Sequence, residues 1–484
     1  MRLSIREIAQ ATGARVVASG NLDAQATSLT WDSRDVREDA LYVALPGERH
    51  DGHDFAAAAA AAGATCVLAS HDLAPEQARA LDEAHTSLLL VPDTAAAITD
   101  LARAWRPRLR GRVIGLTGSN GKTTTKNLVR DVLACAGSVV ATRGNQNNEL
   151  GVPNTLLAAD DDTDFVVVEM GMRGLGQIES LCSFVRPEWG IVTHVGESHI
   201  EILGSRENIA RAKSELVAAL PEGGIAFLND ACDMADFVWE NSGAAANGVS
   251  RVRFDGSGAV DLEHAAGPLV WARGASLDDE GRASFTLCAQ GFAGAKAESV
   301  PCSLELKGLH NVGNACAAAA CALAAGVSLA DVACALAAAK PESGRQEMLR
   351  AKGGFTVVND AYNANPDSMR CALNTFAALR VEGRRIAVLG DMGELGDFAF
   401  AGHAEMGELA AKLGIDELVV VGSLGALIAD AAEKAGMPSS RIARVSCADE
   451  ALEVVKGCVS AHDAVLVKAS HSVGLERVVE GLID

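Results

Sequence analysis

The chain has 484 residues, an apolar content of 49% with only 4% aromatic residues, and a formal net charge of −21. This length predicts about three domains, with cores built mainly from alanine, valine and leucine. The acidic balance excludes a broad basic surface, so we expect neither nucleic acid nor an anionic membrane as a partner.

The 12 cysteines are scattered singly, with no Cys-x-x-Cys pair. This pattern is typical of neither a zinc site nor a disulfide framework, and we expect most of them to be small core residues in a reducing compartment. Residues 1–16 lack the apolar segment of a signal peptide, and no run of about 20 strongly apolar residues is present. These features predict a cytoplasmic protein.

Residues 1–110 predict a small α/β domain. The expected elements are helices at 3–13, 55–62 and 94–106 and strands at 41–45, 65–69 and 87–91. Ser33 and Arg34 lie between the first helix and the first of these strands, and a glycine-bearing loop at 47–53 follows. A hydroxyl and a guanidinium could hold a phosphate or a sugar, although a plain polar turn explains Ser33 and Arg34 equally well.

Residues 113–130 predict a phosphate-binding loop. An apolar strand leads into a glycine-rich turn, and the turn leads into a helix. The loop residues are Gly118, Ser119, Asn120, Gly121, Lys122, Thr123 and Thr124. Backbone N–H groups and the helix N-terminus attract phosphate, while Lys122 would reach the outer phosphates and Thr123 would bind Mg²⁺. Leu116 stands where the longer form of the motif has a glycine, and an ordinary strand-to-helix turn is the alternative.

Two further segments of the expected central domain, residues 111–340, carry polar side chains near this loop. Asn145, Asn147 and Asn148 offer amide groups to a peptide-like substrate, although such a cluster also favours a turn. The apolar run 165–168 predicts a buried parallel strand that ends at Glu169. A carboxylate beside a phosphate loop commonly binds the nucleotide's Mg²⁺, and a solvated strand end is the alternative.

The rest of the central domain offers weaker signals. A strand at 189–195 leads to His199, and a following helix carries Lys213. On spacing alone, His199 could equally be a structural histidine, and Lys213 could equally be a surface lysine. Short alternating segments between about 250 and 306 predict a β-meander, and an alanine-rich helix follows at 312–325. Asn311 lies near the N-cap of this helix, which by itself explains an asparagine there.

Residues 341–484 predict a Rossmann-like, doubly wound α/β domain after a hinge at 341–345. Strands are expected at 356–362, 385–392, 417–422 and 464–469, alternating with helices. Polar residues gather where these strands end: Asp360, Asn363, Asn365, Asp391, Lys468 and Ser470. Open α/β sheets bind ligands at that edge. No Gly-x-Gly-x-x-Gly follows these strands, so a separate dinucleotide site is not expected.

These motifs together resemble the bacterial Mur ligases over essentially the full length of the chain. The shared features are residues 117–124, 168–170, His199, 212–213, 309–311, 344–345 and 468–470. The strings at 145–153, 359–369 and 389–396 are most similar to the MurF type. Two positions depart from the usual pattern: Ala469 stands where glycine is usual, and His471 stands where arginine is usual.

The resemblance implies three α/β domains: an N-terminal UDP-substrate domain, a central P-loop ATPase-like domain with a parallel sheet, and the C-terminal domain. It implies an ATP-dependent ligase that forms ADP and phosphate while adding D-Ala-D-Ala to UDP-MurNAc-tripeptide, a step of peptidoglycan precursor synthesis. ATP would activate the tripeptide carboxylate as an acyl phosphate, which the amine of D-Ala-D-Ala would attack. A monomer is expected.

The resemblance also implies roles for the residues named above. Thr123 and Glu169 would hold one Mg²⁺, and His199 with a carbamylated Lys213 would hold a second. Asn311 would contact adenine, Arg345 and Asp360 would reach the phosphates and ribose, and Ser33 and Arg34 would meet the UDP end. The remaining substrate contacts would come from Asn145, Asn147, Asn148, Tyr362, Asn363, Asn365, Lys468 and Ser470.

Other classes stay open at this point. The ligase that adds the third peptide residue and a folylpolyglutamate synthase share the phosphate loop, but the two MurF-like strings at 359–369 and 389–396 disfavour them. A nucleotide-dependent switch without ligase activity is a third alternative. Phosphate release that depends on D-Ala-D-Ala would separate the switch from a ligase.

Overall fold

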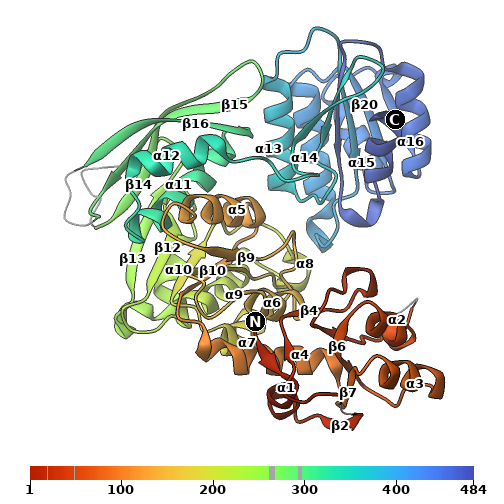
Figure 1. Ribbon diagram of the computed structural model, residues 1–484. Coiled ribbons are helices and arrows are strands. Elements are labelled where there is room, and N and C mark those ends of the chain that lie inside the picture. Colours follow the sequence, from red (N-terminus) through yellow and green to blue (C-terminus); the bar gives the residue numbers. More distant parts are fainter. Residues whose placement is uncertain (19, 48–49, 261–266, 293–296, 484) are drawn as a thin grey trace.

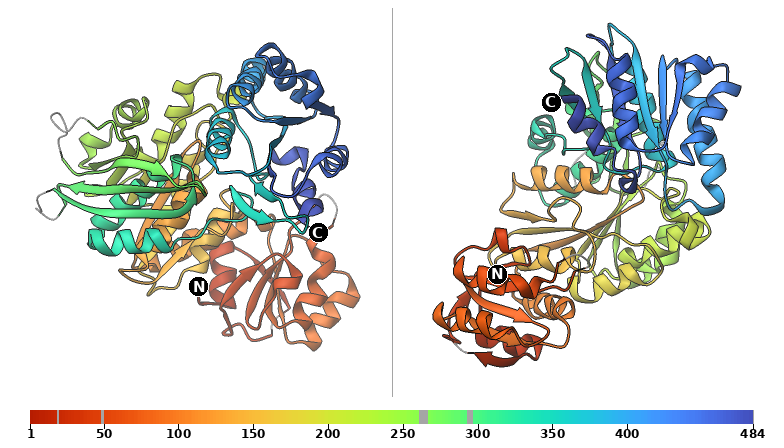
Figure 2. Two further views of the ribbon diagram at one scale, coloured as in Figure 1. Left: turned by 90° about the horizontal axis from the view of Figure 1, so that it is seen from above. Right: turned by 90° about the vertical axis from the view of Figure 1, so that its right-hand side faces the viewer.

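The computed structural model describes residues 1–484 except 19, 48–49, 261–266, 293–296 and 484. Figure 1 shows three α/β parts that follow one another along the chain, the N-terminal part in red to orange, the central part in orange through green to teal and the C-terminal part in light to dark blue. Each part is built around its own main sheet, and a separate two-stranded pair, β1 and β3, lies near the N-terminus. Two further views separate the three parts (Figure 2).

The N-terminal sheet has the order β2-β7-β6-β5-β4, with β2 antiparallel to its neighbour and the other pairs parallel. Its elements are β1 (Leu3–Ser4), α1 (Ile5–Thr12), β2 (Arg15–Ala18), β3 (Gln25–Ala26), β4 (Ser28–Thr30), β5 (Ala40–Val43), α2 (Ala56–Ala61), β6 (Ala64–Ala69), α3 (Pro75–Glu83), β7 (Ser87–Leu90) and α4 (Thr94–Trp105). Ser4 and Glu7 form a capping box at the start of α1, and Gly13 in the left-handed region ends it. Residues 48–49 of the predicted glycine-bearing loop lie outside the described residues.

The central sheet has nine strands in the order β16-β15-β14-β13-β12-β11-β8-β10-β9. Its elements are β8 (Arg112–Thr117), α5 (Lys122–Leu133), β9 (Val139–Ala141), α6 (Gly151–Ala158), β10 (Phe165–Glu169), α7 (Gln177–Val185), β11 (Trp189–Val192), α8 (Ile200–Leu203), α9 (Arg206–Ala218), β12 (Ile225–Asn229), α10 (Ala235–Ser242), β13 (Ser250–Asp255), β14 (Leu269–Leu277), β15 (Arg282–Gln290), β16 (Glu298–Lys307), α11 (His310–Ala324) and α12 (Leu329–Ala338). The expected meander is partly wrong, because β13 pairs in parallel with β12 and with β14. In the described part of this sheet, the antiparallel pairs are β14 with β15 and β15 with β16.

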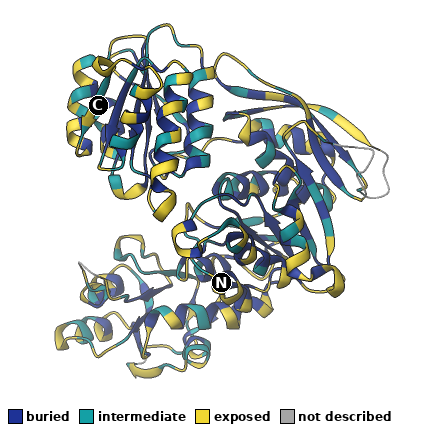
Figure 3. Cartoon of the chain, turned by 180° about the vertical axis from the view of Figure 1, so that it is seen from behind, coloured by how far each residue is buried: buried dark blue, intermediate teal, exposed yellow. Residues whose placement is uncertain are grey.

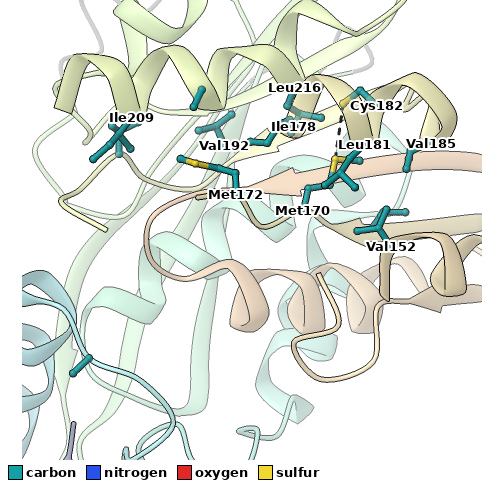
Figure 4. Close-up of a cluster of buried hydrophobic side chains, with 14 of the residues drawn as sticks. Val152, Met170, Met172, Ile178, Leu181, Cys182, Val185, Val192, Ile209 and Leu216 are labelled. Carbon is teal, nitrogen blue, oxygen red and sulfur yellow. Dashed lines mark hydrogen bonds between the residues drawn. The ribbon is translucent and has the colours of Figure 1, made fainter. Parts of the chain in front are cut away.

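Side chains of the central strands alternate between two cores. Val113, Val166 and Val168 pack in the core with α6, α7 and α9, while Ile114 and Val167 pack in the core with α5 and α11. Figure 4 shows the first of these cores, where α7 and α9 close over the sheet. Both faces of the parallel strands are therefore covered by helices, which explains their continuous apolar sequences.

The C-terminal sheet has the order β17-β18-β22-β19-β20-β21, parallel except for β17. Its elements are β17 (Glu347–Arg350), β18 (Thr356–Asn359), α13 (Pro366–Ala378), β19 (Arg385–Gly390), α14 (Ala399–Lys412), β20 (Glu417–Val421), α15 (Gly425–Lys434), β21 (Ile442–Val445), α16 (Ala448–Cys458), β22 (Ala464–Lys468) and α17 (Glu476–Ile483). The four predicted strands are confirmed as the middle of the sheet, and the sequence reading missed the two half-exposed edge strands.

Figure 3 shows buried strands between helices whose outer faces are exposed. Most of the cysteines are buried and all are free thiols, as expected for small core residues. Within the described part of the chain, no helix combines the length and the apolarity needed to cross a membrane.

Candidate functional site

The loop between β8 and α5 is shaped by two glycines that pack against neighbouring segments. Gly121 precedes α5 with a φ of 77°, and a Cβ there would run into the Asn314 side chain on α11. A Cβ on Gly118 would run into the Thr193 hydroxyl after β11. The Ser119 N–H donates to the His194 carbonyl over 2.8 Å, which ties the loop to the same segment. These close approaches explain why both positions are glycine.

Lys122 folds back over this loop. Its Nζ donates to the Gly118 carbonyl over 2.8 Å and to the Ser119 carbonyl over 3.3 Å. Burial lowers the pKa of Lys122, while the Glu169 carboxylate opposes that shift. The ammonium group is thus held at the mouth of the helix, where a phosphate would replace the carbonyl partners.

Thr123 and Glu169 meet beneath the loop because β10 lies beside β8 in parallel register. Glu169 is fully buried, so it is not a solvated strand end. Its Oε1 accepts from Thr123 Oγ1 at 3.2 Å and from Asn147 Nδ2 at 2.8 Å. Its Oε2 is buried without a hydrogen-bond partner among the described residues. A hydroxyl beside a carboxylate with an unused oxygen is a donor set that suits Mg²⁺.

Lys126, one turn after Lys122 on α5, is a residue that the sequence reading missed. Its side chain is only 1% exposed, and Nζ lies 4.0 Å from Glu169 Oε2. Nζ also donates to the Gly144 carbonyl at 2.8 Å, which ties the asparagine loop to the phosphate loop. A lysine on a helix is typical of a surface, so nothing in the local pattern could have singled it out.

His199 begins α8 in the left-handed region, with a φ of 65°. Its Nδ1 contacts a carboxylate oxygen of Glu394, which belongs to the C-terminal part of the chain. Burial lowers the pKa of His199, and Glu394 opposes the shift. Metal-binding histidines typically have a carboxylate against their second ring nitrogen, and Glu394 lies against Nδ1 of His199 in this way.

Lys213 on α9 is buried, with an exposure of 2%, so it is not a surface lysine. Burial lowers its pKa well below the ordinary range, and the neighbouring Lys122 ammonium lowers it further. No hydrogen bond or ion pair to Nζ is present among the described residues. The lowered pKa favours the neutral amine, which is the form that reacts with CO₂.

Arg345 and Asn365 of the C-terminal part both reach the phosphate loop. Arg345 Nη2 donates to Thr123 Oγ1 at 3.0 Å, and its guanidinium carbon lies 4.3 Å from the centroid of the Tyr362 ring. Asn365 caps α13 through its Oδ1, while its Nδ2 donates to Asn120 Oδ1 at 2.8 Å. The loop is thus contacted from a part of the sequence more than 200 residues away.

Three of the predicted C-terminal residues bond mainly to one another at the strand ends. Lys468 Nζ donates to Asp360 Oδ2 at 2.8 Å and to the Asn363 carbonyl at 3.0 Å. Burial raises the pKa of Asp360, while the Lys468 ammonium opposes the shift. Nearby, Ser470 Oγ accepts from the Gly393 N–H at 2.8 Å and donates to the Ala364 carbonyl at 3.3 Å.

Comparison with known proteins assigns each part of the chain to the same family. Residues 25–106 match the model described as the Mur ligase family catalytic domain, residues 116–322 match the Mur ligase middle domain, and residues 344–471 match the Mur ligase glutamate ligase domain. A Mycobacterium tuberculosis relative named UDP-N-acetylmuramoyl-tripeptide–D-alanyl-D-alanine ligase is 38% identical over 100% of this chain and 98% of its own. The chain belongs to the Mur ligase family.

Other relatives of this Mur ligase agree with the assignment. A Bacillus subtilis protein of the same name is 35% identical over 94% of this chain and 92% of its own. A crystal structure of MurF from Acinetobacter baumannii superposes with a TM-score of 0.80 at 28% identity, covering 100% of this chain and 99% of the other. A Thermotoga maritima MurF ligase in complex with ADP has a TM-score of 0.71 at 26% identity, with coverages of 94% and 97%. The expected family and three-domain fold are confirmed.

Several predicted contact residues of this Mur ligase lie apart from the phosphate loop or are engaged locally. Arg34 is exposed, and its guanidinium pairs with Asp32 at 2.6 Å in the N-terminal part, next to Ser33. Asn311 does not cap α11, since its Nδ2 donates to the Lys307 carbonyl at 2.7 Å. Asn148 accepts from the Gly151 N–H at 3.0 Å at the start of α6.

Three other predicted residues are partly or fully exposed to solvent. Thr124 is half-buried on α5, while Asn145 and Asn363 are exposed on their loops. The centre of the site is formed by Lys122, Thr123 and Glu169 of the central part. Around it lies a rim of exposed amide side chains, among them Asn145 and Asn363.

Proposed function

We propose that this Mur ligase adds D-Ala-D-Ala to UDP-MurNAc-tripeptide in an ATP-dependent reaction that forms ADP and phosphate. The observation that carries the proposal is the full-length similarity to relatives named for this reaction, together with a buried Thr123–Glu169 pair beneath the phosphate loop. We also assign residues 1–110 to the UDP-substrate domain, 111–340 to the ATP domain and 341–484 to the ligase domain. A cytoplasmic monomer completes this proposal.

Residues around the phosphate loop are assigned to the different groups of ATP. Gly118 to Thr124 surround the phosphates, and the Lys122 ammonium stabilises charge that develops on the transferred phosphoryl group. Arg345 adds a second cation beside Thr123 and releases that hydroxyl when ATP enters. Asn311 lies at the start of α11 near the loop and is assigned to adenine, and Asp360 to ribose.

The metal-binding roles follow from the donors that the site offers. Thr123 Oγ1 and the Glu169 oxygen that accepts no hydrogen bond would hold one Mg²⁺, while His199 and a carbamate on Lys213 would hold a second. When bound, these ions would neutralise phosphate charge during phosphoryl transfer. The burial of Lys213 and its lowered pKa support carbamylation, because a protonated lysine cannot attack CO₂.

Substrate recognition is assigned to the rim. Ser33 and Arg34 would bind the UDP end, with Arg34 exchanging Asp32 for a phosphate. The peptide end and D-Ala-D-Ala would meet Asn145, Asn147, Asn148, Tyr362, Asn363, Asn365, Lys468 and Ser470. Contacts between the C-terminal part and the phosphate loop exclude water from the acyl phosphate, which would otherwise hydrolyse.

The deciding experiment measures phosphate release from ATP with UDP-MurNAc-tripeptide, with and without D-Ala-D-Ala, and identifies the product by mass. We expect sustained release only with all three substrates and a product enlarged by one D-Ala-D-Ala unit. Phosphate release at the same rate with and without D-Ala-D-Ala would overturn the proposal. Sedimentation of the purified chain tests the monomer.

Carbamylation has its own test. Lys213→Ala should lose most activity while its melting temperature stays near that of the wild type. The native mass of the wild type should include the added CO₂, and this increment should fall as the pH is lowered, because protonation removes the reactive amine. Full activity of Lys213→Ala would contradict the assignment.

A further inference from the structure

Cys232 lies in the turn between β12 and α10, behind the segment 193–199 that leads from β11 to His199. The Val195 N–H donates to Cys232 Sγ over 3.4 Å, and the thiol is buried. His194 and Cys232 are both among the residues that line one small, mostly apolar cavity of about 10 Å³, roughly the size that admits one water molecule. A nucleophilic sulfur atom is thus held beside a histidine and a space for a small molecule.

The surroundings of this thiol differ from those of the buried Cys182. Burial acts to raise the pKa of Cys232, but the His194 imidazole and the N–H groups of Val195 and Met234 outweigh it, so the pKa is lowered. By contrast, burial raises the pKa of Cys182 to about 12. A thiolate is the reactive form of cysteine, so Cys232 is the more reactive of the two.

His194 is itself held by a carboxylate. Its Nε2 lies 3.9 Å from Asp367 Oδ2, at the start of α13. Burial acts to lower the pKa of His194, but Cys232 and Asp367 outweigh it, so the pKa is raised. Thiol, imidazole and carboxylate therefore follow one another, an order that favours the protonated imidazole, which can donate a proton.

The opposite side of segment 193–199 contacts the phosphate loop. The His194 carbonyl accepts from the Ser119 N–H at 2.8 Å, and Thr193 Oγ1 donates to the Asn120 carbonyl at 2.6 Å. Ser198 Oγ donates to the Ser119 carbonyl at 3.3 Å. A group added to the sulfur would push on Val195 and thereby move the residues that support Ser119 and Asn120.

We propose that Cys232 is a site of oxidation by hydrogen peroxide, and that its sulfenic acid weakens ATP binding by displacing segment 193–199 from the phosphate loop. The thiolate attacks one peroxide oxygen, an S–O bond forms and the O–O bond breaks. Sulfur loses two electrons to the peroxide, and the departing hydroxide takes the proton of His194 and leaves as water.

The oxidation can be tested without any assay of ligation. Wild type, Cys232→Ser and the matched control Cys182→Ser are treated with hydrogen peroxide and a dimedone-type trap, and the labelled cysteines are located by mass spectrometry of peptides. We expect Cys232 to be labelled about tenfold faster than Cys182, and His194→Asn to slow that labelling. Equal labelling rates at Cys232 and Cys182 would overturn the proposal.

The effect on the site is measured as binding of a fluorescent ATP analogue, and thermal melting of each variant confirms that it is folded. Peroxide should weaken binding in the wild type and in Cys182→Ser but leave Cys232→Ser unchanged, and dithiothreitol should restore binding. Unchanged binding at full Cys232 oxidation would overturn the proposal, as would equal loss in Cys232→Ser. The inferred loss of ligation rests on the proposed function. If the proposed function is wrong, the untreated enzyme will bind ATP but will not ligate, and this result is distinct from the outcomes above.

Discussion

Replacing Lys126 by methionine removes the cation that faces a buried carboxylate and keeps most of the side-chain volume. Nζ lies 4.0 Å from Glu169 Oε2 and donates to the Gly144 carbonyl at 2.8 Å. At this separation the attraction is about 4 kcal/mol with an effective dielectric constant of about 20. Loss of one partner from a buried pair typically costs about 3–5 kcal/mol. Since Thr123 and Asn147 still donate to Glu169, we expect a loss of about 3 kcal/mol.

The assay is urea unfolding followed for wild type, Lys126→Met, Glu169→Gln and the double variant. If the two charges interact as the structure indicates, the double variant should lose less than the sum of the single variants, with a coupling of about 2 kcal/mol. Lys340→Met, at an exposed position after α12, is the control and should change the free energy of unfolding by less than about 0.5 kcal/mol. Additive losses in the double variant would refute the reasoning, because they would show that Lys126 does not act through Glu169.

Three further substitutions test separate parts of the site. Lys122→Ala should lower ATP-dependent phosphate release by at least about 100-fold with an unchanged melting temperature, and turnover like that of the wild type would contradict its role at the phosphoryl group. Arg34→Ala should raise the KM for the UDP substrate about tenfold and leave the KM for ATP unchanged, because only a charged contact to the UDP end is lost; an equal rise for both substrates counts against the assignment. Gly121→Ala should cost about 1–2 kcal/mol of stability and weaken ATP binding, since a Cβ at a φ of 77° meets Asn314; calorimetry that finds normal binding would show that the loop tolerates the change.

The features that depend on local pattern could be predicted from the sequence. An apolar run, two glycines, a lysine and a threonine predict a strand, a phosphate loop and a helix wherever they occur in this order, and β8 and α5 have these positions. The four central strands of the C-terminal sheet were readable because buried parallel strands are continuously apolar. The edge strands β17 and β21 were not predicted, because half-exposed edge strands lack a continuous apolar run.

Only the tertiary structure decided which of the isolated polar residues share one site. Lys126 and Lys213 look like surface residues of helices, yet both are buried because α5 and α9 pack against the central sheet. Glu394 reaches His199, and Arg345 reaches Thr123, because the C-terminal part folds back onto the loop. Local pattern records the backbone preference of each segment, whereas burial and charge pairing depend on segments hundreds of residues apart and exist only once the chain has packed.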